Sequence, residues 1–172
     1  MEALSDFLIS TGIGDYVATY DWVWPICETL HFFGMSVLIG TVGAVDLRVL
    51  GVAKGIPISL LDKFIPLGVI AFFVNMITGF IFIAGNPVGG PMEYLTNLSL
   101  QIKMVLVLIA GINLLVFYAT GIHRSLETVP ADGNAPGRAK AIAAVSLASW
   151  IFVIVMGRFI MYNDTLLYAL GL

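Results

Sequence analysis

The chain has 172 residues, of which 59% are hydrophobic and only 11% are charged, and its formal net charge at pH 7 is -3. Its mean hydropathy is +1.00. These values exclude an ordinary water-soluble domain, and no basic run indicates a nucleic-acid partner. Cys27 is the only cysteine, so an internal disulfide and a multi-cysteine metal site are excluded as well.

Residues 1–22 are predicted to form a short amphipathic segment that lies at the membrane interface. Their apolar residues recur at roughly helical spacing, and Gly12 and Gly14 are expected to interrupt the pattern. Trp22 and Trp24 follow at the level where an aromatic belt is expected. The segment contains no lysine or arginine, the reverse of a signal peptide, and its acidic residues are Glu2, Asp6, Asp15 and Asp21.

Four hydrophobic stretches follow, each long enough to cross a bilayer, at about residues 25–49, 64–84, 98–122 and 141–162. A bilayer core of roughly 30 Å requires about 20 apolar residues in a helix. We therefore expect an all-α integral membrane bundle of four transmembrane helices, with residues 1–172 forming a single domain. The glycine- and proline-rich run from Asn86 to Pro91 predicts a non-helical loop between the second and third spans.

The basic residues predict the orientation of the bundle. The connection between the first two spans and the connection between the last two hold six basic residues, whereas the N-terminal arm, residues 85–97 and the C-terminal tail hold none. The positive-inside rule therefore places both termini outside and the two basic connections in the cytoplasm. Asp46, Arg48, His123 and Arg124 are expected to lie at the interface with the lipid headgroups.

Four ionisable residues are predicted at similar depth in the outer leaflet. Glu28 and His31 lie in the first turns of the first span, Lys103 begins the third and Arg158 ends the fourth. Glu28 and His31 are three positions apart and share a helix face, with Met35 one turn further along. If Glu28 is ionised, the two basic residues leave one uncompensated positive charge, which an anionic ligand would neutralise.

Haem b is the cofactor that this pattern favours. His31 would be the axial ligand of the iron, Glu28 would be its hydrogen-bond partner, and Lys103 and Arg158 would hold the propionates. His123 lies near the other end of the bundle, so it cannot ligate the same iron within one chain. The sixth position would be open, or taken by a methionine or by His31 of another subunit. The candidate methionines are Met35, Met76, Met104 and Met156. The predicted function is electron transfer to or from a quinone or a periplasmic partner.

Four alternatives remain open. The protein could be a cofactor-free accessory subunit of a larger membrane complex, or a homo-oligomer, in which the polar residues only fix helix packing. The Glu28–His31 spacing also resembles half of a di-iron carboxylate site, which would require several copies of the chain. A small transporter or proton relay could extend from Glu28 and His31 through the deeper polar residues. These deeper residues are Asn75, Thr78 and Asn113. A quinone site or second cofactor site near Tyr118 and His123 is the last alternative.

Three motifs carry a resemblance to known proteins. Glu28–Gly34 (ETLHFFG), Asp46–Gly51 (DLRVLG) and Gly157–Tyr162 (GRFIMY) resemble a family of uncharacterised bacterial four-helix inner-membrane proteins over nearly the whole chain. That resemblance implies the fold and a bacterial inner-membrane location, and it implies no activity; together with the positive-inside rule, it makes both termini periplasmic in expectation. The architecture is more loosely similar to small membrane b-type cytochromes and to copper-resistance membrane proteins. The chain lacks the paired histidines on different helices that two-haem cytochromes use.

Overall fold

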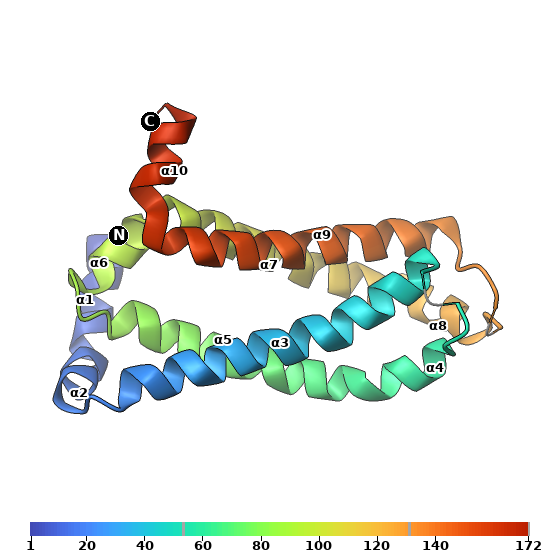
Figure 1. Cartoon of the computed structure of the whole chain (residues 1–172), viewed down its shortest axis with the longest axis horizontal. Helices are drawn as coiled ribbons and strands as arrows, with labels where there is room; N and C mark the ends of the chain where they lie inside the picture. Colours follow the sequence, from blue (N-terminus) through green and yellow to red (C-terminus); the bar gives the residue numbers. More distant parts are fainter. Residues whose placement is uncertain (53, 131, 172) are drawn as a thin grey trace. The chain divides into compact units, whose positions relative to one another are not determined.

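The computed structural model describes residues 1–52, 54–130 and 132–171, and these residues form helices and connections without a strand. Four helices are long and apolar enough to cross a membrane (Figure 1). They are α3 (Val23–Leu50), α5 (Ile65–Ala84), α7 (Leu98–Ala119) and α9 (Gly137–Phe159). The predicted all-α fold with four membrane-spanning helices is confirmed.

Short helices precede, connect and follow the long ones. They are α1 (Glu2–Ser10), α2 (Ile13–Thr19), α4 (Ile58–Leu61), η1 (Asp62–Phe64), α6 (Gly90–Thr96), α8 (Ile122–Glu127), η2 (Ile160–Tyr162) and α10 (Asn163–Leu170). The break between α1 and α2 is at Gly12, whose φ of 71° is left-handed, whereas Gly14 lies inside α2.

Two predicted boundaries were wrong for local reasons. The third span ends at Ala119 instead of Ile122, because Gly121 adopts a left-handed φ of 70° and a new helix begins after it. The run from Asn86 to Pro91 is not wholly a loop, since α6 begins at Gly90. Proline is tolerated in the first turn of a helix, where its missing N–H would have had no acceptor within the helix, and Pro91 lies there.

The chain divides into two compact units, which are described separately. Unit 1 comprises Met1–Ser36, Ala71–Lys103 and Met156–Leu172, and unit 2 comprises Val37–Ile70 and Met104–Val155. The expectation that residues 1–172 form a single domain stays a prediction.

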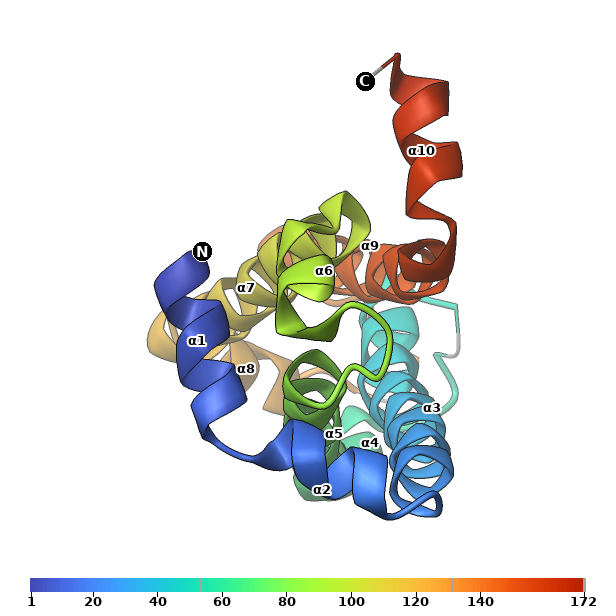
Figure 2. The ribbon, with the colours of Figure 1, turned by 90° about the vertical axis from the view of Figure 1, so that its left-hand side faces the viewer.

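In unit 1 the N-terminal helices pack on the ends of the long ones. Helix α1 contacts α6 (Figure 2), and α2 packs on α3 and α5 through a buried cluster of Val17, Val23 and Cys27. Asn97 lies between α6 and α7. Its side-chain amide donates to the carbonyl of Ile160 at 3.0 Å, which joins the start of α7 to η2.

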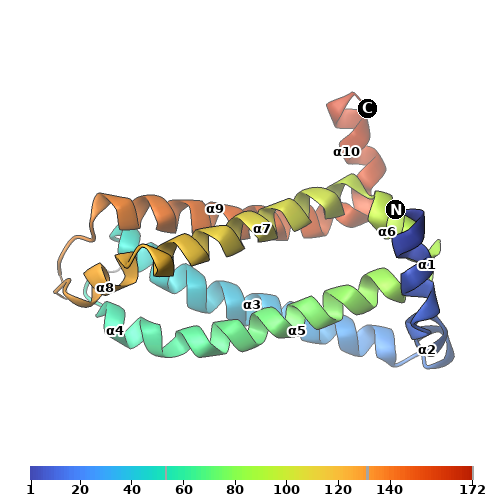
Figure 3. The same cartoon turned by 180° about the vertical axis from the view of Figure 1, so that it is seen from behind.

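In unit 2 the end of α3 meets α4, α8 and the start of α9, and Figure 3 shows α4 and α8 side by side. Small and branched apolar residues form the buried core here: Val45, Val49, Ile58, Leu126, Ala135, Ala139 and Ala143. Such small side chains allow close approach of helices in lipid.

Arg48 and Asp46 are buried in unit 2, with 1% and 7% of their surfaces exposed. The Arg48 guanidinium donates from Nε to the Ile56 carbonyl at 2.6 Å, and from Nη2 and Nη1 to Pro130 and Gly133 at 3.4 and 3.5 Å. The prediction that both side chains lie among the headgroups was therefore wrong. The two connections fold over the end of α3 and supply the carbonyl acceptors that a buried guanidinium requires.

Candidate functional site

His31 is held by one turn of a neighbouring helix in unit 1. Its Nδ1 lies 2.8 Å from Oγ1 of Thr78 on α5, and its ring lies 5.2 Å from the ring of Phe82, centroid to centroid. Thr78 and Phe82 are four residues apart, so both face α3. Between them, Gly79 offers no side chain, and a Cβ there would lie 3.8 Å from His31 Cε1. The imidazole is half-buried, and its orientation is set by these contacts.

Asn75, one turn before Thr78, lies against a glycine of α3. Its Nδ2 donates to the Ala71 carbonyl at 2.9 Å, and a Cβ on Gly34 would overlap the same nitrogen. Its Oδ1 is buried and has no hydrogen-bond partner within residues 1–52, 54–130 and 132–171. A buried acceptor without a donor is costly, so such groups are rare in native proteins.

Lys103 completes the group from α7. Its side chain is half-buried and lies along Gly157 of α9, where a Cβ would be 3.6 Å from Nζ. The positive charge of Lys103 acts on the His31 ring. In the described part of the chain, Lys103 forms no hydrogen bond or ion pair.

We call His31, Asn75, Thr78 and Lys103 the polar cluster. Three of its members lie against a glycine of a different helix: His31 against Gly79, Asn75 against Gly34 and Lys103 against Gly157. The fit is close at Gly34, where a Cβ would overlap Asn75, whereas a Cβ at Gly79 or Gly157 would be in ordinary van der Waals contact with the polar side chain. The cluster offers an imidazole, an amide oxygen without a partner and an ammonium group.

Glu28 is outside the polar cluster. Its exposed carboxylate accepts a hydrogen bond from Trp24 Nε1 at 3.0 Å, and the Trp24 ring lies 5.0 Å from that of Phe82. The predicted hydrogen bond from His31 to Glu28 is thus replaced by one to Thr78. The indole one turn before Glu28 is the nearer donor on the helix surface, and α5 supplies the partner for the imidazole.

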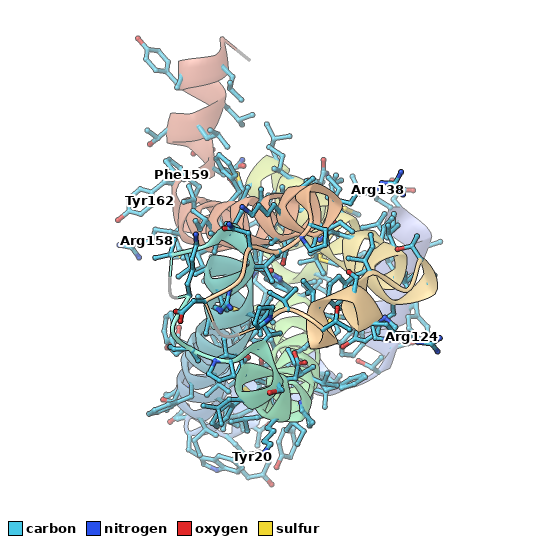
Figure 4. All side chains as sticks on the ribbon, turned by 90° about the vertical axis from the view of Figure 1, so that its right-hand side faces the viewer. Tyr20, Arg124, Arg138, Arg158, Phe159 and Tyr162 are labelled. Atoms are coloured by element: carbon cyan, nitrogen blue, oxygen red, sulfur yellow. The ribbon has the colours of Figure 1, made fainter. Side chains whose placement is uncertain are left out.

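Arg158 also binds elsewhere. Its guanidinium is exposed, donates from Nη2 to the Tyr162 hydroxyl at 3.4 Å and lies 5.2 Å from the centre of the Tyr162 ring, a cation–π geometry. Figure 4 shows both side chains projecting from the same part of the ribbon. Met35 is half-buried on α3 and belongs to unit 1. Of the five predicted site residues, the structure places His31 and Lys103 in the polar cluster.

The acidic residues of unit 1 are all exposed. They are Glu2, Asp6, Asp15, Asp21, Glu28, Glu93 and Asp164. Burial raises the pKa of Tyr94 on α6, and the nearby carboxylates of Glu93 and Glu28 raise it further. The half-buried charge of Lys103 has no acidic partner among the described residues.

The other predicted polar residues lie in unit 2. Asn113 donates from Nδ2 to the Ile142 carbonyl at 3.0 Å, an interhelical bond of the kind that stabilises packing. The His123 ring lies 4.9 Å from the Tyr118 ring, and its Nδ1 is buried without a partner in the described chain. No three histidine, cysteine, aspartate or glutamate side chains come together among the residues described, so a di-iron site would need further copies.

Sequence reasoning missed the three glycines and Ser99. Gly34 and Gly157 lie within the motifs quoted above, and Gly79 directly follows Thr78, so each is close to a polar residue in the sequence. That proximity was the available signal. Ser99, one turn before Lys103, is fully buried, and its hydroxyl has no partner in the described ranges. Its small size left no distinguishing signal in the sequence.

The chain was also compared with known proteins. No protein-family model, curated protein or solved structure matches it.

Proposed function

We propose that this chain is a small bacterial inner-membrane protein that binds haem b through His31. The haem would lie near the periplasmic face and exchange electrons with a quinone or a periplasmic partner. The observation that carries the proposal is the geometry of His31. Nδ1 is tied to Thr78, whereas Nε2 has no partner in the described chain, on a ring next to Gly79 and within the field of Lys103.

The residues of the polar cluster suit this cofactor. Haem iron requires an imidazole nitrogen with a lone pair, and the propionates favour a cation. His31 and Lys103 offer these two groups, and each lies next to a glycine, Gly79 and Gly157 respectively. Bound haem would supply one-electron chemistry. Glu28 and Arg158 bind Trp24 and Tyr162, so they play no part in this form of the proposal.

In this proposal the protein contributes the orientation of the His31 imidazole and the positive charge of Lys103. Thr78 and Phe82 hold the imidazole in one orientation, and Lys103 supplies a positive charge that would hold a propionate. Met35, Met76 and Met156 belong to the same unit and are the candidates for a sixth ligand. A second copy of the chain, contributing its own His31, is the other candidate.

Exposed apolar surface and the distribution of charge support the proposed membrane location and orientation. Large apolar side chains are exposed along α7, such as Leu108 and Leu115, and would contact lipid. Unit 1 has its seven acidic residues exposed, and the six basic residues of the two connections all belong to unit 2. By the positive-inside rule, the two basic connections would face the cytoplasm and both termini the periplasm.

The test is an absorption spectrum of detergent-purified protein, oxidised and then reduced with dithionite, from cells supplied with a haem precursor. We expect a Soret band with sharp reduced α and β bands, lost in His31→Ala. His123→Ala is the matched control, because it removes the only other histidine and should leave the spectrum unchanged. A featureless spectrum from folded parent protein would refute the haem proposal.

The second candidate is a cofactor-free subunit whose polar cluster only fixes packing. The observation in its favour is that His31, Asn75 and Lys103 each fit against a glycine of another helix. This candidate predicts a colourless protein in which His31→Ala lowers thermal stability and changes no spectrum.

A further inference from the structure

Thr78 contacts both His31 and its own helix through a single oxygen. Its Oγ1 lies 2.8 Å from His31 Nδ1, 2.8 Å from the Val74 carbonyl and 3.3 Å from the Asn75 carbonyl. The side chain is 3% exposed, so bulk water does not compete for these contacts. One hydroxyl oxygen is therefore within hydrogen-bond distance of one imidazole nitrogen and two carbonyl oxygens.

These contacts determine which groups donate. A threonine hydroxyl has one hydrogen, and a carbonyl oxygen can only accept. Two carbonyl oxygens within reach of Oγ1 favour the hydroxyl hydrogen on the 2.8 Å contact with Val74, which leaves an Oγ1 lone pair for His31. Since a hydrogen bond to that lone pair needs a donor, the hydrogen lies on Nδ1. In the neutral imidazole the second nitrogen, Nε2, then carries a lone pair and no hydrogen.

We infer that Thr78 is a positioning residue that holds His31 as the Nδ1–H tautomer, so that the polar cluster takes a Lewis-acidic metal centre at Nε2. A ligand that needs a donor at Nε2, such as a quinone carbonyl, would be disfavoured at this nitrogen. The choice of ligand class deepens the proposed function and rests on it. The tautomer itself depends only on the contacts of Thr78.

The tautomer can be measured without any cofactor. The chain has two histidines, so a His123→Gln background leaves one imidazole for nitrogen-15 labelling. In micelles, at a pH where the ring is neutral, the nitrogen shifts distinguish a protonated ring nitrogen from a bare one. We expect protonated Nδ1 and bare Nε2 in this background and in Thr78→Ser, and a mixture of tautomers in Thr78→Val, which has the same shape without the hydroxyl.

A protonated Nε2 in the His123→Gln background would overturn the inference, and so would an unchanged tautomer in a folded Thr78→Val variant. Circular dichroism and size-exclusion chromatography check folding, and the measurement on the background protein stands even if Thr78→Val does not fold. Adding zinc protoporphyrin IX should shift the Nε2 signal, whereas a short-chain ubiquinone should not. A shift of the Nε2 signal with the ubiquinone, and none with zinc protoporphyrin IX, would refute the choice of ligand class.

The outcomes also separate the inference from the proposed function. A colourless protein with the Nδ1–H tautomer would refute haem binding and leave the role of Thr78 intact. A haem protein whose cofactor-free form has the Nε2–H tautomer would support haem binding and refute the role of Thr78.

Discussion

Replacement of Arg48 by methionine should be among the most destabilising changes in the chain. The guanidinium donates to carbonyls in two separate connections, those of Ile56 on one side and of Pro130 and Gly133 on the other. Methionine keeps much of the buried hydrocarbon and removes every donor. The 2.6 Å bond to Ile56 should contribute about 1.5–3 kcal/mol as a charge-assisted bond, and the two longer bonds about 1 kcal/mol each. We expect Arg48→Met to lower the free energy of unfolding by about 3–5 kcal/mol.

The assay is reversible unfolding in mixed micelles with increasing sodium dodecyl sulfate. Arg138→Met is the matched control, because Arg138 is exposed at the start of α9 in the same unit and should change stability by less than about 0.5 kcal/mol. Arg48→Lys keeps the charge but not the planar fork, so we expect an intermediate loss. If Arg48→Met unfolds within 0.5 kcal/mol of Arg138→Met, roughly the expected scatter for surface changes, the argument for a structural guanidinium fails.

Two further predictions concern unit 1. Gly34→Ala should destabilise the protein by about 1–3 kcal/mol, because its Cβ would overlap Asn75 Nδ2, whereas Gly40→Ala, with no atom within 4 Å of its Cβ, should change stability little. The same unfolding assay distinguishes them, and equal effects would contradict the close fit at Gly34. Ultraviolet titration should find a Tyr94 pKa above the usual value of about 10, because burial and then the carboxylate of Glu93 disfavour the phenolate. Glu93→Gln should lower the pKa of Tyr94. An unchanged pKa in that variant would refute the electrostatic contribution of Glu93.

The fold was predictable because it depends on hydrophobic length, which the sequence displays directly. The predicted second span of about 64–84 is close to α5, which begins at Ile65 and ends at Ala84. The end of the third span was not predictable in this way. Apolar residues continue through the turn at Gly121, so hydropathy alone carries the span past the point where the backbone leaves the helix.

The candidate site was predictable only in part, because hydropathy identifies polar residues in a span and not their partners. His31 and Lys103 were identified as unusual residues within apolar stretches. Their neighbours depend on which turn of α5 faces α3 and on which glycine lies opposite, and these are properties of packing. Arg48 shows the same limit, since its charge alone suggested the lipid headgroups, and two of the carbonyls to which it donates belong to residues more than 80 positions away.

The unpartnered groups of the polar cluster favour binding over packing. A cluster that served packing alone would be expected to satisfy its own polar atoms, because a partly satisfied buried network is less stable than an apolar one. In the described chain, Thr78 is fully engaged, but Asn75 Oδ1 and Lys103 have no partner. Polar and ionisable groups of this kind inside a membrane are expensive unless a ligand, water or another chain completes them. The proposed cofactor would bring an anion to Lys103 and bind the Nε2 lone pair of His31, whereas Asn75 Oδ1 would still need a donor such as water.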